Sequence, residues 1–170
     1  FSWLLLLPLA FPPYIIAYTY TGLLDFSGPA QSYLRELFDW GYGDYWFPEI
    51  RTLSGAIAML SLVLYPYIYL LTRTAFSEQS ASFREASHIL GIGLPKTFLK
   101  VALPLARPAI IAGFTLVAME TLADYGTVHY FGVPTFTTGI FRTWFGLGDR
   151  IAATQLASLL LLCVFPLSIV

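Results

Sequence analysis

Two carboxylates and a tyrosine stand close together in a long apolar segment of the chain. Glu120 and Asp124 are four residues apart, and Tyr125 follows directly. Side chains at this spacing share one face of an α-helix, with their Cβ atoms about 6 Å apart. Acidic residues inside a membrane usually mark an ion or solute route, and oxygen ligands suit hard cations. The three residues are therefore candidates for a translocation path, with an interfacial or helix-packing role for the two acids as the alternative.

Sequence motifs for enzyme chemistry are absent: there is no Walker A pattern, no G-x-S-x-G elbow and no H-E-x-x-H pair. His88 and His129 stand alone, and Cys163 is the single cysteine, so neither a zinc site nor a disulfide framework is predicted. A membrane enzyme with Glu120 and Asp124 as general acid and base would need a nucleophile that the sequence does not supply. We expect no catalytic residues and no cofactor bound by this chain.

The composition is typical of a membrane protein. Of the 170 residues, 57% are hydrophobic, 17% are aromatic and only 11% are charged, against roughly 25% charged residues in an average soluble domain. The net charge is −1, so no basic surface is available to bind nucleic acid. A soluble globular fold is excluded, and we expect the chain to lie in a lipid bilayer.

Four apolar segments approach the roughly 20 helical residues that cross a bilayer. They cover residues 1–24, 53–71, 105–128 and 151–170. The sequence thus predicts an all-α fold, a polytopic transmembrane bundle in a single domain. We expect Pro8, Pro12 and Pro13 to kink or break the first segment. The chain begins without Met and ends inside an apolar stretch, which is typical of a piece of a longer membrane protein.

The loops between these segments differ in basic residues, which orient membrane proteins. Loop 25–51 contains Arg35 and Arg51, whereas residues 73–107 contain five basic side chains, namely Arg73, Arg84, Lys96, Lys100 and Arg107. We expect the second loop on the cytoplasmic side and loops 25–51 and 130–150 on the outer side. Aromatic residues cluster at 40–47, which fits a segment at the headgroup level, with a partner-docking surface as the alternative.

The cytoplasmic loop, at about residues 77–104, carries signals for two short helices. Ser82 and Glu85 match a capping box, in which Ser82 accepts from a backbone N–H and Glu85 reaches back to the Ser82 N–H. We expect this helix to end at the glycine turn 91–93. Pro95 suits the first turn of a second helix, which leads into the next span.

The same loop closely resembles the EAA loop of permease subunits of ATP-binding-cassette importers. The family pattern reads E-A-A, three residues, G, nine residues, I-x-L-P, and at these spacings the chain has Glu85-Ala86-Ser87, Gly91 and Val101-Ala102-Leu103-Pro104. Ser87 and Val101 are small departures from it. Residues 103–109, 120–128 and 130–142 also resemble the ferric-iron permeases of this superfamily, which are often two fused halves. This chain resembles the end of a first half.

The resemblance implies roles and partners. In the family this loop is a coupling helix that sits in a groove of the ATPase subunit, which implies an ATPase-coupling role for Glu85, Ala86, Ser87, Gly91, Leu103 and Pro104. The implied partners are a cytoplasmic ATP-binding-cassette ATPase that binds and hydrolyses ATP, a periplasmic solute-binding protein and the remaining half of the permease. The implied function is a path for ferric iron across the bacterial inner membrane. Molybdate, sulfate or polyamine transport and a non-transporting membrane-assembly subunit are the alternatives.

Overall fold

The computed structural model describes residues 3–41, 43–79 and 93–169, and every regular element in these ranges is a helix. The all-α prediction is therefore confirmed. In chain order the elements are η1 (Leu4–Ala10), α1 (Pro13–Leu24), α2 (Pro29–Phe38), α3 (Leu53–Glu78), α5 (Leu94–Thr97), η2 (Phe98–Ala102), α6 (Leu103–Ala123), α7 (Gly126–Tyr130), α8 (Phe136–Phe141), η3 (Arg142–Gly146), α9 (Arg150–Val164) and η4 (Phe165–Ile169).

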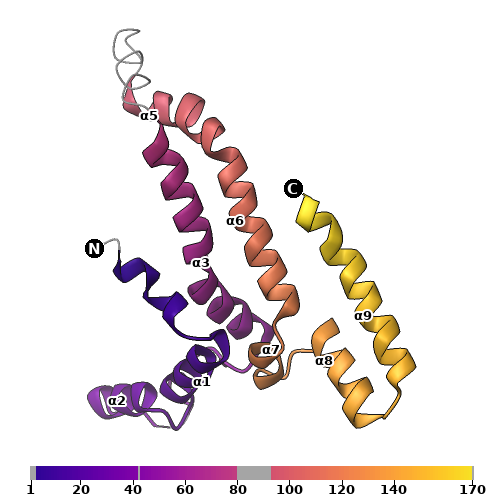
Figure 1. The fold of residues 1–170 in the computed structure, drawn as a ribbon. Coiled ribbons are helices and arrows are strands. Elements are labelled where there is room, and N and C mark those ends of the chain that lie inside the picture. The colour runs from indigo at the N-terminus through magenta and orange to yellow at the C-terminus, as the bar shows by residue number, and fades with distance from the viewer. Residues whose placement is uncertain (1–2, 42, 80–92, 170) are drawn as a thin grey trace.

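Two long helices form the axis of the molecule. α3 and α6 run antiparallel beside each other, with α5 at one end and α1, α2, α7 and α8 gathered at the other (Figure 1). In the described ranges three helical stretches are long and apolar enough to cross a membrane, namely Leu53–Glu78, Pro95–Ala123 and Arg150–Leu167. A fourth is obtained if the bent N-terminal pair of helices is counted as one span.

The first apolar segment is not one straight helix. η1 and the helical stretch Pro13–Phe38 meet at an angle of 104°. The break lies at Phe11 and Pro12, whose backbones are extended. Each of these residues precedes a proline, and a following proline disfavours the α conformation. Pro13 then begins α1, at a position where a missing N–H costs nothing. The proline break expected from the sequence therefore follows from Pro12 and Pro13.

The third and fourth apolar segments end differently from their predicted bounds. α6 stops at Ala123, because Asp124 is extended and a separate short helix follows. α9 gives way to the 3-10 helix η4 at the segment that contains Pro166. The second break falls within a continuously apolar stretch, so hydrophobicity alone does not register it, whereas Asp124 and Gly126 mark the first one.

The contact between α3 and α6 is close because one glycine lies between the two backbones. A Cβ atom added to Gly113 of α6 would stand 2.8 Å from the Ile68 Cα of α3. The buried side chains lie toward the other end of α3, where it meets α1 and α7. They form two adjoining clusters, one with Ala17, Ala56, Met59 and Phe131 and the other with Leu60, Val63, Leu64 and Val128.

Replacing Gly113 by alanine tests this contact. The methyl group would push against backbone rather than a flexible side chain, so we expect Gly113→Ala to lower the free energy of unfolding by about 1–3 kcal/mol. Thermal unfolding of the purified permease in detergent measures the change. Gly22→Ala is the matched control, because Gly22 lies in α1 with no atom within 4 Å of an added Cβ. Equal melting temperatures for the two variants would contradict the close contact.

Candidate functional site

The residues expected to couple to an ATPase divide into two groups. Glu85, Ala86, Ser87 and Gly91 lie outside the described residues. Leu103 and Pro104 are partly buried and begin α6. At the same end, the Gln79 side-chain amide donates a hydrogen bond of 3.0 Å to the Ala102 carbonyl. This bond ties the end of α3 to the start of α6, so the two borders of the predicted coupling loop are held together.

A π-helical turn leads into α6. In η2 the Leu103 N–H bonds to the Phe98 carbonyl, five residues back. Pro104 has no N–H, and its ring would crowd a carbonyl in a regular α-helical turn, so a wider turn at this place accommodates it. Lys96 and Lys100 are exposed on this segment. The predicted loop therefore ends in a segment that carries two exposed lysines and a π-helical turn that accommodates Pro104.

Glu120 lies in the last turn of α6, and its side chain is exposed. In the described part of the chain it has neither a hydrogen bond nor an ion pair. An exposed carboxylate that none of the described groups engages can take a cation or a partner group from outside. Of the two acids singled out in the sequence, Glu120 is the one whose carboxylate is available.

Asp124 accepts two hydrogen bonds within the protein. Its Oδ2 accepts a hydrogen bond of 3.0 Å from the Val128 N–H, and its carbonyl accepts one of 2.7 Å from the Thr137 hydroxyl. Asp124 thus follows the last residue of α6, and its hydrogen bonds connect it to both α7 and α8. The four-residue spacing from Glu120 suggested a shared helical face, but α6 ends before Asp124. The observed contacts favour the helix-packing role that the sequence left as an alternative.

Tyr125 lies in a pocket formed by α7, α8 and η3. Its ring stacks on His129 with ring centroids 4.9 Å apart and on Phe141 at 4.0 Å. The cavity has a volume of about 560 Å³ and is also lined by Thr135, Thr138 and Arg142. Among its lining residues Arg142 is the fixed charge and no carboxylate is present. Aromatic faces, hydroxyls and a guanidinium can hold a polar solute or an anion briefly, but they supply no nucleophile.

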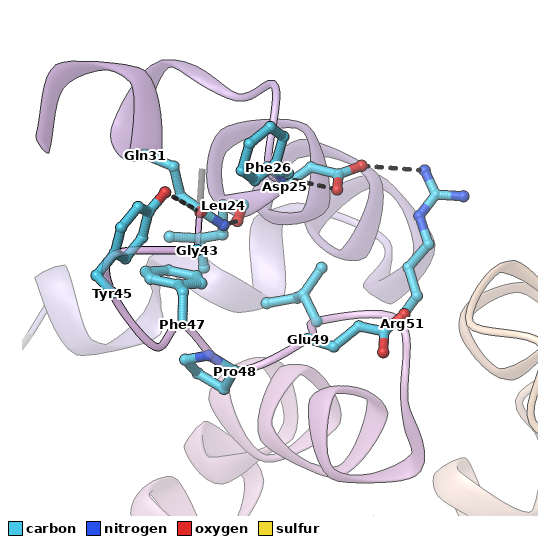
Figure 2. A pocket seen from close by; sticks show the side chains of 11 residues that line it. Leu24, Asp25, Phe26, Gln31, Gly43, Tyr45, Phe47, Pro48, Glu49 and Arg51 are labelled. Atoms are coloured by element: carbon cyan, nitrogen blue, oxygen red, sulfur yellow. Dashed lines mark hydrogen bonds and ion pairs between the residues drawn. The ribbon is translucent and has the colours of Figure 1, made fainter. Parts of the chain in front are cut away.

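A second cavity, of about 410 Å³, lies at the same end of the molecule between α2 and the start of α3 (Figure 2). At its edge Arg51 pairs with Asp25 at 3.7 Å, and its guanidinium also stands over the Tyr130 ring, 5.2 Å from the centroid. Both charged side chains are about half exposed, so the pair contributes at most about 1 kcal/mol. Arg51 nevertheless joins three elements, since Asp25 follows α1 and Tyr130 ends α7.

Neither Arg51 nor Arg142 was predicted from the sequence as a site residue. Their site contacts depend on residues far along the chain, such as Tyr130 for Arg51, so local spacing gave no indication of them. A local signal did exist for Arg142, because the capping box of Thr135 and Thr138 starts the helix that carries it into the pocket. Among the described residues no cluster of three or more metal-ligating side chains is found.

Comparison with known proteins gives the family. Residues 1–170 match the family described as "Binding-protein-dependent transport system inner membrane component". The ferric transport system permease protein FbpB of Actinobacillus pleuropneumoniae is 28% identical over 165 residues, which cover 92% of this chain and 23% of the relative. The molybdenum transport system permease protein ModB of Haemophilus influenzae is 26% identical over 125 residues, or 74% of this chain and 52% of the relative. The Fe(3+)-transport system permease protein FbpB 2 of the same organism is 28% identical over 117 residues, or 68% and 23%.

The helical spans and the loop motif define a transport permease of the multi-pass, inner-membrane class. The chain belongs to the binding-protein-dependent transport system inner membrane components, the permeases of ATP-binding-cassette importers. It spans about half of the molybdenum relative and about a quarter of the ferric relatives.

The role of Asp124 can be separated from a charge requirement. Asparagine keeps an oxygen that can accept from the Val128 N–H, whereas alanine does not. We expect Asp124→Asn to unfold near the wild-type temperature and Asp124→Ala to lose about 0.5–2 kcal/mol of stability, as for loss of a helix cap. Thermal unfolding in detergent is the measurement. If the asparagine and alanine variants were equally destabilised, the negative charge rather than the cap would be the important property.

Proposed function

We propose that this chain forms part of the translocation path of an ATP-driven importer and that its solute is ferric iron. The family match supports the transport role. The observation that carries the solute is the alignment with the Actinobacillus protein, which is named for ferric transport and matches 92% of the chain, compared with 74% for the molybdenum relative. Glu120 supplies an available carboxylate at the end of α6, and Tyr125 supplies a phenolic oxygen in the adjoining pocket.

The importer works as an assembly. A cytoplasmic ATPase binds the 77–104 loop and holds the ATP, so this chain needs no cofactor of its own. A solute-binding protein delivers its cargo at the opposite end, near loops 25–51 and 130–150, and further permease helices complete the path. The basic residues Arg84, Lys96 and Lys100 of the 77–104 loop support its cytoplasmic placement. The arrangement in Figure 1, with α5 at one end and α2 and α8 at the other, is consistent with this topology.

The coupling role predicts a specific defect. A proline at Gly91 would distort the turn that ends the coupling helix, and an arginine at Glu85 would reverse a charge at the contact. We expect Gly91→Pro and Glu85→Arg to lower both capture of the ATPase subunit by the tagged permease and solute-stimulated ATP hydrolysis. Glu36→Arg is the matched charge reversal, since Glu36 is an exposed residue of α2, at the end of the molecule remote from α5 (Figure 1). Wild-type capture and hydrolysis in the Gly91 and Glu85 variants would refute the docking role.

An oxyanion is the second candidate solute. The pocket around Tyr125 contains the guanidinium of Arg142, the His129 ring and two threonine side chains, with no carboxylate among its lining residues. Such a site suits an anion like molybdate better than a bare cation. The name of the molybdenum relative supports the same reading.

One pair of variants distinguishes the two solutes. The complete importer, reconstituted in vesicles, is supplied with labelled iron or labelled molybdate. For an iron permease we expect iron uptake only, and Glu120→Gln should reduce it by roughly ten- to a hundredfold, since a charged contact is worth about 1.5–3 kcal/mol. Molybdate uptake that is lost in Arg142→Gln would instead establish the oxyanion reading. Arg150→Gln is the matched control for Arg142, because Arg150 is exposed and stands over Trp144 rather than in this pocket.

Uptake is expressed per assembled complex, so that a folding defect is not mistaken for a transport defect. An assembled complex that binds the ATPase but takes up neither iron, molybdate, sulfate nor polyamine would support the membrane-assembly alternative and overturn the transport proposal.

A further inference from the structure

Helix α2 presents its polar side chains to the protein. Gln31 is 5% exposed, and its side-chain amide donates to the Leu24 carbonyl at 2.8 Å. The Tyr45 hydroxyl donates to the Gln31 side-chain carbonyl at 2.7 Å, and Figure 2 shows the two groups pointing toward each other. Both ends of the buried amide are therefore satisfied, and the 43–50 segment is fastened to the inner side of α2.

Arg35 lies one turn further along and extends this network. Its guanidinium donates to the Phe26 carbonyl and the Tyr45 hydroxyl, each at 2.9 Å, and to the Ser32 hydroxyl at 3.0 Å. It also stands over the Phe26 ring, 4.3 Å from the centroid. In the described part of the chain no carboxylate pairs with Arg35. The side chains of Gln31, Ser32 and Arg35 are thus bonded within the protein, whereas Glu36 is exposed.

The opposite side of α2 is apolar and uncovered. Tyr33 and Leu37 are 65% and 59% exposed, and their four-residue spacing places them on one side of the helix. Phe38, which is 54% exposed, is the last residue of α2 and lies seven residues from Gln31, so it extends the uncovered surface at the end of the helix. The surface continues into the segment after α2, where Phe38, Trp40 and Tyr45 stack with ring centroids 4.6 and 5.2 Å apart. The outer side of α2 therefore exposes the large apolar side chains of Tyr33 and Leu37, whereas its inner side holds Gln31 and Arg35.

The position of α2 fits a membrane surface. The stretch Pro13–Phe38 is bent by 104° from η1, and α2 lies at the end of the α3–α6 pair that is remote from α5 (Figure 1). Tyrosine and tryptophan side chains favour the boundary between headgroups and acyl chains, where a ring can be buried while its polar atom stays wet. A helix that lies in this boundary buries its apolar side toward the acyl chains.

We propose that the exposed side of Tyr33 and Leu37, together with Phe38 at the end of the helix, is a lipid-binding surface that lies in the headgroup–acyl boundary of the bilayer. A soluble partner is the less suitable occupant, because each dissociation would expose these three side chains to water, whereas lipid covers them continuously. The lipid contact would fix α2 and, through Tyr45 and Gln31, the wall of the cavity beside Arg51. This inference depends on neither the identity of the solute nor the ATPase contact.

Spin labelling of the full permease in lipid vesicles tests this surface. In a Cys163→Ser background, a nitroxide is attached to Leu37→Cys or Tyr33→Cys, with Glu36→Cys as the matched control on the same helix. Collision with oxygen, which concentrates in the acyl region, is compared with collision with a water-soluble nickel chelate. We expect the oxygen-to-nickel ratio to be severalfold higher at positions 33 and 37 than at position 36.

Two results would overturn the proposal. Equal, nickel-dominated ratios at all three positions would place this face of α2 in water. Low accessibility to both reagents at positions 33 and 37, with a mobile label at position 36, would mean that protein rather than lipid covers the face. Because the substitutions are at exposed sites, thermal unfolding of each labelled protein should match that of the Cys163→Ser background.

Discussion

The hydrogen bonds of Asp124 hold together the end of the molecule where both cavities lie. A helix that stops inside or near a bilayer leaves backbone groups that water cannot reliably satisfy, so the break requires partners from the protein. The Asp124 carboxylate is the partner of the Val128 N–H, and the Thr137 hydroxyl is the partner of the Asp124 carbonyl. The chain can therefore turn from a long span into two short helices without leaving these groups unpaired. The pocket around Tyr125 exists because of this turn.

α7 has only five residues, yet its side chains face three neighbours. His129, together with Tyr125 just before the helix, lines the pocket toward α8. Thr127 and Val128 are buried. Tyr130 contacts Arg51 and the Tyr18 ring. Successive residues of a helix are rotated by about 100°, so one short turn can reach all three sides. A displacement of α7 would change the pocket and the contact with Arg51 at the same time. The two cavities are thus mechanically connected through one helix.

The sequence predicted the helical class, the membrane setting and the break at Pro12 and Pro13, because each depends on local composition or local sterics. It did not predict that Asp124 caps a new helix, since the four-residue spacing from Glu120 assumes that α6 continues. It also could not orient α2. An amphipathic pattern reveals two faces, but the inward one is selected by Tyr45 and the Leu24 carbonyl, and the Tyr45 contact forms only in the folded chain.

The irregular features of the long helix α6 lie at one of its ends. α6 has 21 residues and so spans about 30 Å, close to the thickness of a bilayer core. Its irregular features lie near the coupling-loop end, where the π-turn η2 precedes Pro104, and Pro108 follows one turn later. Beyond them, Gly113 holds the helix against the α3 backbone at Ile68. A displacement at the predicted coupling loop would therefore reach the irregular first turns of α6 before it reaches Gly113. Because Gly113 lies against the α3 backbone, a displacement of α6 beyond this residue must move α3 and α6 together. α7 and the pocket beside it would move with them.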